Sequence, residues 1–200
     1  MWLKLCGCTN SDDARAIAGS GADAVGFVFA PGPRRVSAEA AQHLARICKN
    51  LVRIGVFVDE DIETVNDIRS TCKLDAVQLH GSESPQYCRR LGGTLIKAFR
   101  LRDSAELQQM QHYPMVWKFL IDAFVPGRRG GTGKRIGDDL LIRVSNPDNV
   151  IVAGGVNKDN LRHILGLIQP FGLDVSSGVE KSPGLKDKVK INQLITTIRE

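Results

Sequence analysis

The chain has 200 residues, 42% of them hydrophobic and 24% charged, which is enough for one well-developed core. No apolar run approaches the roughly 20 residues that a membrane-spanning helix needs. The N-terminal sequence MWLKLCGCTN also lacks the apolar stretch of a signal peptide. The composition therefore excludes a membrane protein and predicts a single domain over residues 1–200, located in the cytoplasm.

The net charge permits an anionic ligand without identifying one. It is +5, with an isoelectric point of about 9.1, but the 27 basic residues are interleaved with 22 acidic ones. The number of cysteines is odd, and their spacing lacks the C-x-x-C pairs of zinc ribbons and thioredoxin-like sites. We therefore expect neither a disulfide framework nor a zinc site. The cysteines are Cys6, Cys8, Cys48, Cys72 and Cys88.

Short apolar runs with β-forming residues recur along the whole chain and predict eight strands. They are spaced by roughly 20 to 30 residues, which leaves room for a helix in each interval. The predicted strands are Leu3 to Cys6, Ala24 to Phe29, Val52 to Val58, Ala76 to Leu79, Thr94 to Ala98, Lys118 to Ile121, Val150 to Ala153 and Leu173 to Val175.

The segments between the strands predict helices that begin at Ser, Asp or Asn, the residues preferred at helix N-termini. The sixth interval is the exception, because only Asp138 to Val144 remains for a helix after a glycine-rich stretch. The other predicted helices are Ser11 to Gly19, Ser37 to Lys49, Asp61 to Thr71, Ser84 to Leu91, Ser104 to Gln111, Asn157 to Ile168 and Asp187 to Ile198.

Regular alternation of strand and helix requires parallel strands, and eight such units close into a barrel. We predict an α/β protein built as a single, compact (β/α)8 TIM barrel with a short or missing sixth helix. The alternative is an open doubly wound sheet, which usually has a G-x-G-x-x-G turn after its first strand. Here that turn reads Cys6-Gly7-Cys8-Thr9. In a barrel, the residues just past each strand would carry the chemistry.

Cys6 ends the first predicted strand and Asp122 directly follows the sixth, and each has a functional and a structural interpretation. A thiol at the barrel mouth could remove a proton if a nearby cation, such as Lys4 on the same strand face, favoured the thiolate. A cysteine on a buried strand is more often an inert small hydrophobe. Asp122 follows three apolar residues, so its carboxyl could hold a proton to donate, or it could cap the following turn.

Two glycine-containing loops give the strongest signal for a ligand. Ala153 to Asn157 follows the seventh strand, and Asp174 to Glu180 follows the eighth. Loops after strands seven and eight are where barrels of this class bind a substrate phosphate, through backbone amides. Either loop alone would be an ordinary turn, but the two together predict a small phosphorylated substrate.

The basic segment Gly127 to Arg135 could suggest nucleotide or nucleic-acid binding. It departs from the Walker pattern at Arg128 and Arg135, and it lacks the aromatic residues and repeats of RNA-binding segments. A flexible loop that closes over an anionic substrate fits better. The alternative from another functional class is a nucleic-acid-binding module built on this segment, and we expect no such binding.

Arg34 and Arg35 lie in a proline-rich loop after the second strand, where a guanidinium could bind a carboxylate. The simpler interpretation is a solvated surface pair. His80 directly follows the fourth predicted strand, near the end of the run Val77 to Gly81, and could face the same barrel mouth. A buried structural histidine is at least as common.

Through short motifs around these residues, the chain resembles the phosphoribosylanthranilate isomerase family over nearly its whole length. The motifs occur in the family's order, and their combination is specific although each is short. They are Lys4 to Gly7, Gly26 to Phe29, Gly55 to Asp59, Gln78 to Gly81, Leu120 to Asp122, Gly130 to Gly133, Ala153 to Gly155, Asp174 to Glu180 and Pro183 to Asp187.

The resemblance implies an isomerase of tryptophan biosynthesis. The reaction would be the Amadori rearrangement of N-(5-phosphoribosyl)anthranilate to 1-(2-carboxyphenylamino)-1-deoxyribulose 5-phosphate, without cofactor or metal. The residue matching Asp122 would act as general acid and the one matching Cys6 as general base. The related indole-glycerol-phosphate synthase shares the barrel and phosphate site but normally uses lysine and glutamate, so it fits less well.

The same resemblance implies the rest of the substrate site. Arg34 would hold the anthranilate part with Asp174 beside it, although a loop one residue shorter than usual leaves Arg35 as the alternative. The protein would act alone or as a homodimer on this small molecule. The remaining predicted substrate-binding residues are His80, Gly133, Gly154, Gly155, Ser176, Ser177 and Gly178.

Overall fold

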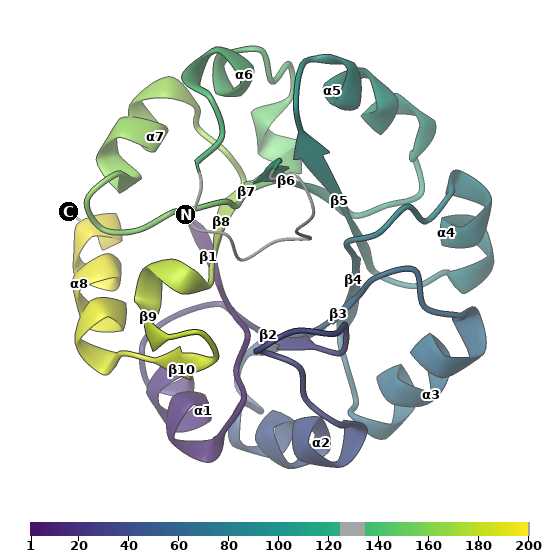
Figure 1. Ribbon diagram of the computed structural model, residues 1–200, viewed down its shortest axis with the longest axis vertical. Coiled ribbons are helices and arrows are strands. Elements are labelled where there is room, and N and C mark those ends of the chain that lie inside the picture. The colour runs from purple at the N-terminus through teal and green to yellow at the C-terminus, as the bar shows by residue number, and fades with distance from the viewer. Residues whose placement is uncertain (125–134, 200) are drawn as a thin grey trace.

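A computed structural model describes residues 1–124 and 135–199 and shows a closed barrel of parallel strands (Figure 1). Each strand pairs with the next in the chain, and β1 pairs with β8 to close the ring. This confirms the predicted barrel and excludes the open sheet. The strands are β1 Trp2–Cys6, β2 Ala24–Val28, β3 Val52–Phe57, β4 Ala76–Leu79, β5 Leu95–Leu101, β6 Lys118–Ala123, β7 Val150–Val152 and β8 Gly172–Val175.

The α-helices form a ring outside the barrel (Figure 1). The sixth is short, as predicted, and the fifth is equally short because a 3-10 turn continues it. The helices are α1 Ser11–Ala18, α2 Ala38–Ile47, α3 Ile62–Thr71, α4 Pro85–Leu91, α5 Ala105–Gln109, α6 Asp138–Ile142, α7 Leu161–Leu167 and α8 Lys188–Arg199, with 3-10 turns η1 Met110–His112, η2 Pro147–Asn149 and η3 Ser177–Val179.

Side-chain caps fix the starts of four of these helices. In each, the side-chain oxygen accepts a hydrogen bond from the backbone N–H three residues on, which satisfies a donor that has no partner within the helix. The capping residues are Asn10, Ser37, Asp61 and Ser84.

The predicted start of the seventh helix was wrong by four residues. Asn157 forms a turn instead, because its Oδ1 accepts hydrogen bonds from the backbone N–H groups of Asp159 and Asn160. The helix then begins at Leu161. The loop after β7 is therefore longer than the sequence pattern indicated.

One feature of the fold was not predicted. A small antiparallel hairpin follows η3 and consists of β9 Glu180–Ser182 and β10 Leu185–Lys186. Its turn contains Gly184 with a φ of +84°, a conformation that glycine adopts without strain. Pro183-Gly184 was a visible turn signal, but the flanking strands are too short to stand out in the sequence. Figure 1 shows this hairpin between α8 and α1.

Two layers of apolar side chains make the core. The larger lies between the barrel and its helices, and the smaller fills the barrel interior. Trp2, Trp117 and Phe171 pack against one another with ring centroids 5.4 to 6.1 Å apart, at the start of β1, β6 and β8. The interior residues are Ala24, Ile54, Ala76, Ile96, Ala98, Leu120, Ile151 and Ala153.

Replacing Ile96 with alanine should lower the free energy of unfolding by about 2 to 5 kcal/mol, because the barrel interior cannot collapse around the cavity. Ile96 is fully buried. Urea unfolding followed by circular dichroism measures the change. Ile142→Ala is the matched control, since Ile142 is 63% exposed and should cost far less. Equal losses in the two variants would contradict the packing described here.

Candidate active site

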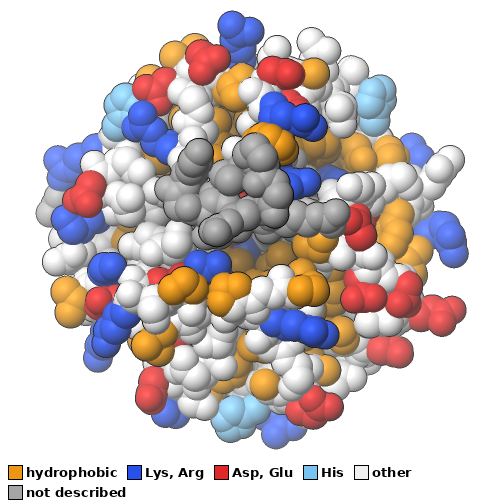
Figure 2. Space-filling model, viewed as in Figure 1, with side chains coloured by type: hydrophobic (Ala, Val, Ile, Leu, Met, Phe, Trp, Pro, Cys, Tyr) orange, Lys and Arg blue, Asp and Glu red, His pale blue; other side chains and the backbone are white. Residues whose placement is uncertain are grey.

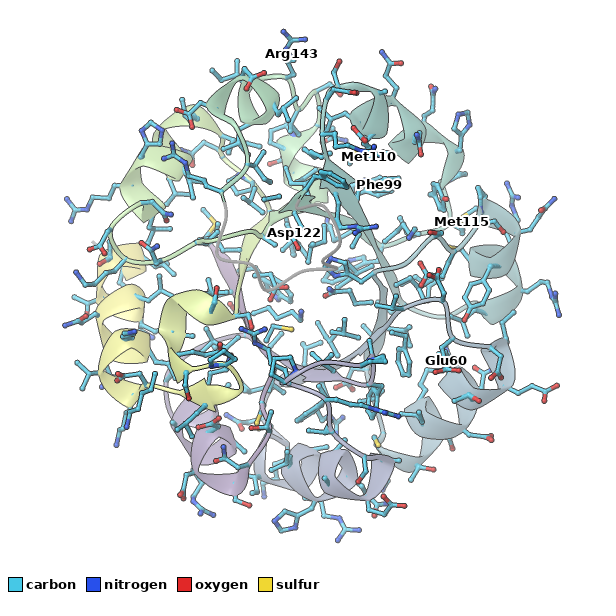
Figure 3. All side chains as sticks on the ribbon, in the orientation of Figure 1. Glu60, Phe99, Met110, Met115, Asp122 and Arg143 are labelled. Atoms are coloured by element: carbon cyan, nitrogen blue, oxygen red, sulfur yellow. The ribbon has the colours of Figure 1, made fainter. Side chains whose placement is uncertain are left out.

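A pocket opens at the end of the barrel where the strands finish, and it collects most of the predicted site residues. It encloses about 890 Å³ of space, part of it open to solvent. Figure 3 shows Asp122 near the centre of the ring of strands. The predicted residues lining this pocket are Cys6, Arg34, His80, Asp122, Gly154, Gly155, Asp174, Ser176 and Ser177.

Cys6 lies at the end of β1, where a glycine on the neighbouring strand makes room for it. A Cβ on Gly26 would lie 2.6 Å from the Cys6 Sγ and 2.9 Å from Lys4 Cε, so a larger residue could not stand there. Burial raises the pKa of the Cys6 thiol, and the positive charges of Lys4 and Lys186 act against this rise. The site thus has a thiol and two cations that favour its thiolate form.

Lys4 lies deeper in the barrel than Cys6 and is completely buried. Its Nζ donates to the Gln78 Oε1 at 2.7 Å and to the Asp174 Oδ2 at 3.0 Å. Burial alone would lower the pKa of Lys4, but the negative charges of Asp174 and the Cys6 thiolate outweigh it and raise the pKa. The ammonium is therefore charged.

Asp122 lies within β6, one residue before its end, and its side chain turns into the pocket. Its Oδ1 accepts a hydrogen bond from the Ala123 backbone N–H at 2.8 Å, and its Oδ2 lies 3.4 Å from the His80 Nε2. Gly154, with a φ of +79°, packs against it: a Cβ there would lie 2.8 Å from the Asp122 Oδ1. One carboxyl oxygen is thus held, while the other faces His80.

Arg34, and not Arg35, lines the pocket, since the Arg35 side chain is exposed. Arg34 lies across Gly7, whose φ is +81° and where a Cβ would come within 2.6 Å of the Arg34 Cδ. Its Nε and Nη2 donate to the two carboxylate oxygens of Glu180, at 2.8 and 2.6 Å. These bonds fix the plane of the guanidinium and leave Nη1 for a ligand.

Glu180 and Lys186, on the unpredicted hairpin, join three parts of the site. Lys186 is buried, and its Nζ donates to the Glu180 Oε1 at 2.8 Å, to the Ser176 carbonyl at 3.3 Å and to the Cys6 carbonyl. Burial alone would raise the pKa of Glu180, but Arg34 and Lys186 outweigh it and hold the pKa low. Both residues belong to recognised motifs, but Cys6 and Arg34, the partners that connect them to the pocket, are far away in sequence, so their roles were missed.

Three buried polar atoms in the pocket have no hydrogen-bond partner among the described residues. They are the His80 Nε2, the Asp174 Oδ1 and the Ser176 Oγ. Buried polar groups are almost always satisfied, so such a cluster indicates a place for the polar atoms of a ligand. The site is preformed to bind a polar molecule.

The loops after β7 and β8 meet at one side of the pocket. Gly154 and Gly155 have φ values of +79° and +65°, which turn the chain so that its backbone borders the pocket. Gly178 does not line it. A Cβ on Gly178 would collide with the Val156 carbonyl, so this glycine allows the two loops to pack together.

Gly133 and most of the basic segment Gly127 to Arg135 lie outside the described residues; Arg135 lies 3.5 Å from Asp138. Figure 2 shows basic and acidic side chains interleaved around this end of the barrel, outside the grey residues.

Within residues 1–124 and 135–199, no group of His, Cys, Asp and Glu could hold a metal ion.

Comparison with known proteins gives the family. Residues 3–197 match the model of N-(5'-phosphoribosyl)anthranilate (PRA) isomerase. The chain belongs to the PRA isomerase family. It is therefore an isomerase of tryptophan biosynthesis, and the resemblance inferred from the motifs is confirmed.

Relatives and solved structures cover almost the full length of this PRA isomerase family member. The isomerase of Desulforudis audaxviator is 45% identical, over 99% of this chain and 98% of the relative. That of Pelobacter propionicus is 41% identical, over 99% and 95%. The solved isomerase of Thermus thermophilus superposes with a TM-score of 0.90 at 35% identity, over 100% of this chain and 98% of that one.

None of the helices in the described part of this PRA isomerase family member is long and apolar enough to cross a bilayer.

Alkylation should report the raised pKa of the Cys6 thiol. Iodoacetamide should modify Cys6 more slowly near neutral pH than it modifies the same cysteine in a free peptide, because the thiolate is the reactive form. The rate of Cys6 modification should still be rising at pH values where the peptide thiol is already fully ionised and its rate has levelled off. Mass spectrometry with fragmentation distinguishes Cys6 from Cys8. A Cys6 rate at neutral pH equal to that of the peptide would contradict this assignment.

Proposed function

We propose that this protein converts N-(5-phosphoribosyl)anthranilate to 1-(2-carboxyphenylamino)-1-deoxyribulose 5-phosphate, with Asp122 as general acid and Cys6 as general base. The supporting observation is that a thiol beside two cations and a carboxyl with one uncommitted oxygen line the same pocket. Both are needed for an Amadori rearrangement, which moves protons and requires no redox change.

In the proposed reaction, Asp122 gives its proton to the ring oxygen of the ribose, and the bond from C1 to that oxygen breaks. The electron pair on the anthranilate nitrogen forms a C1=N bond, which gives an open-chain iminium ion. The Cys6 thiolate then removes the proton from C2, and the electrons move toward nitrogen to give an enolamine. Transfer of the enol proton to C1 gives the ketone.

The remaining pocket residues would place this substrate. The phosphate would lie against the loops after β7 and β8, where Gly155, Ser176 and Ser177 border the pocket. The anthranilate carboxylate would bind Nη1 of Arg34, since Glu180 occupies the other two guanidinium nitrogens. His80, Gly154 and Asp174 would complete the site.

The comparisons support a phosphorylated small molecule as substrate. A solved PRA isomerase is bound to reduced 1-(o-carboxyphenylamino)-1-deoxyribulose 5-phosphate; it superposes with a TM-score of 0.86 at 34% identity, over 100% of this chain and 98% of that one. Its ligand differs from the proposed product only by reduction. The monomeric or homodimeric state, the cytoplasmic location and the absence of nucleic-acid binding stay predictions.

Cys6→Ser and Asp122→Asn should each lower kcat by about 10² to 10⁴-fold, because each removes one proton-transfer group. A serine hydroxyl is a far weaker acid than a thiol, and an asparagine has no proton to give to the ring oxygen. The loss of phosphoribosylanthranilate fluorescence measures the rate. Circular dichroism establishes that both variants are folded.

Two matched controls make the same substitutions away from the pocket. Cys8→Ser lies two residues from Cys6 but does not line the pocket, and Asp148→Asn lies in the exposed part of η2. Both should retain kcat close to wild type. Full activity of Cys6→Ser or Asp122→Asn would remove the corresponding role, and a wild-type gene that fails to restore growth of a tryptophan auxotroph lacking the isomerase would contradict the reaction itself.

A further inference from the structure

A row of buried side chains runs across the barrel at the base of the pocket, from Asp174 to Asp122. Asp174 binds Lys4, and Lys4 binds Gln78. The Gln78 Nε2 then lies 3.0 Å from the His80 Nδ1, and the His80 Nε2 lies 3.4 Å from the Asp122 Oδ2. The row therefore links the strand that carries the proposed base with the residue proposed as acid.

The chemistry of Lys4 decides which way the Gln78 amide points. An ammonium group has only donors, so the atom of Gln78 that lies 2.7 Å from it must be the carbonyl oxygen. The amide nitrogen of Gln78 then faces His80. Gln78 is almost completely buried, so water has little room to compete for either end of the amide.

The orientation of Gln78 in turn decides the tautomer of His80. The amide nitrogen has only donors, so the His80 Nδ1 must accept its hydrogen bond and cannot carry a proton. The proton of the neutral imidazole is therefore on Nε2, the atom that has no hydrogen-bond partner within the described residues and that faces Asp122 across 3.4 Å.

We propose that Gln78 is a positioning residue that holds His80 in its neutral Nε2–H tautomer, so that His80 presents a hydrogen-bond donor to Asp122 as that carboxyl gives up its proton. This inference rests on the proposed role of Asp122. A hydrogen bond to a carboxylate is stronger than one to a neutral acid, so the donor stabilises Asp122 more after proton transfer than before it. His80 thus favours the step without taking the proton itself.

Gln78→Glu tests this with the smallest change in shape. The carboxylate keeps its bond to Lys4 but can only accept hydrogen bonds, so it should draw the proton of His80 to Nδ1. Two-bond ¹H–¹⁵N correlation spectra of the ligand-free protein show which nitrogen is protonated, and His80→Asn identifies the His80 signals among those of the four histidines. We expect Nε2–H in the wild-type protein and a proton on Nδ1 in Gln78→Glu.

The kinetic expectation is a fall in kcat of about 10²-fold in Gln78→Glu, the size of effect seen when one donor to a developing oxyanion is lost, with KM nearly unchanged. Gln193→Glu, on the exposed face of α8, adds the same charge far from the pocket and should leave both constants unchanged.

Three results would overturn the proposal: Nδ1–H in the wild-type protein, an unchanged tautomer in Gln78→Glu, or a changed tautomer with wild-type kcat. The wild-type spectrum decides the tautomer even if the variant does not fold. Because the spectra need no substrate, a wild-type protein that fails to convert phosphoribosylanthranilate contradicts the proposed function separately.

Discussion

The buried ammonium group of Lys4 is the constraint on which the rest of the site depends. Removing a charge from water costs several kcal/mol even after the protein relaxes, so the barrel must supply partners. It supplies one from β8, Asp174, and one from β4, Gln78. Since Lys4 itself belongs to β1, its two hydrogen bonds hold three strands in a fixed relation at the base of the pocket.

The same solution recurs elsewhere at the barrel mouth. Lys97 on β5 is buried, and its Nζ donates to the Glu83 Oε2 at 2.7 Å and to the Gly81 carbonyl at 2.8 Å. Glu83 also accepts a hydrogen bond from the Gly81 backbone N–H. Both the N–H and the carbonyl of Gly81, in the loop that follows His80, are therefore held by this ion pair. The ion pair of Glu180 and Lys186 holds the loop after β8 in the same way, because Lys186 also donates to the Ser176 carbonyl. Buried ion pairs thus fix the conformation of two loops at the barrel mouth.

The fold and most of the residues that line the pocket could be predicted because both follow from local patterns. Strand spacing indicated the barrel, and the position of Cys6 and Asp122 at strand ends indicated the mouth. The partners could not be predicted, because they depend on distances between segments far apart in the chain: Lys4 and Asp174 are separated by 170 residues. Gln78 could be recognised only as part of the motif Gln78 to Gly81, since a polar residue within a strand gives no sign of which side chain it contacts.

Closure of the barrel by β1 and β8 determines when the site can exist during synthesis of the chain. The strand that carries Cys6 leaves the ribosome well before Asp174, Ser176 and Lys186 have been added. Such distant pairings are slow to form. Until they do, Lys4 has no carboxylate to neutralise it, and the pocket stays incomplete until β8 has been made and has paired with β1.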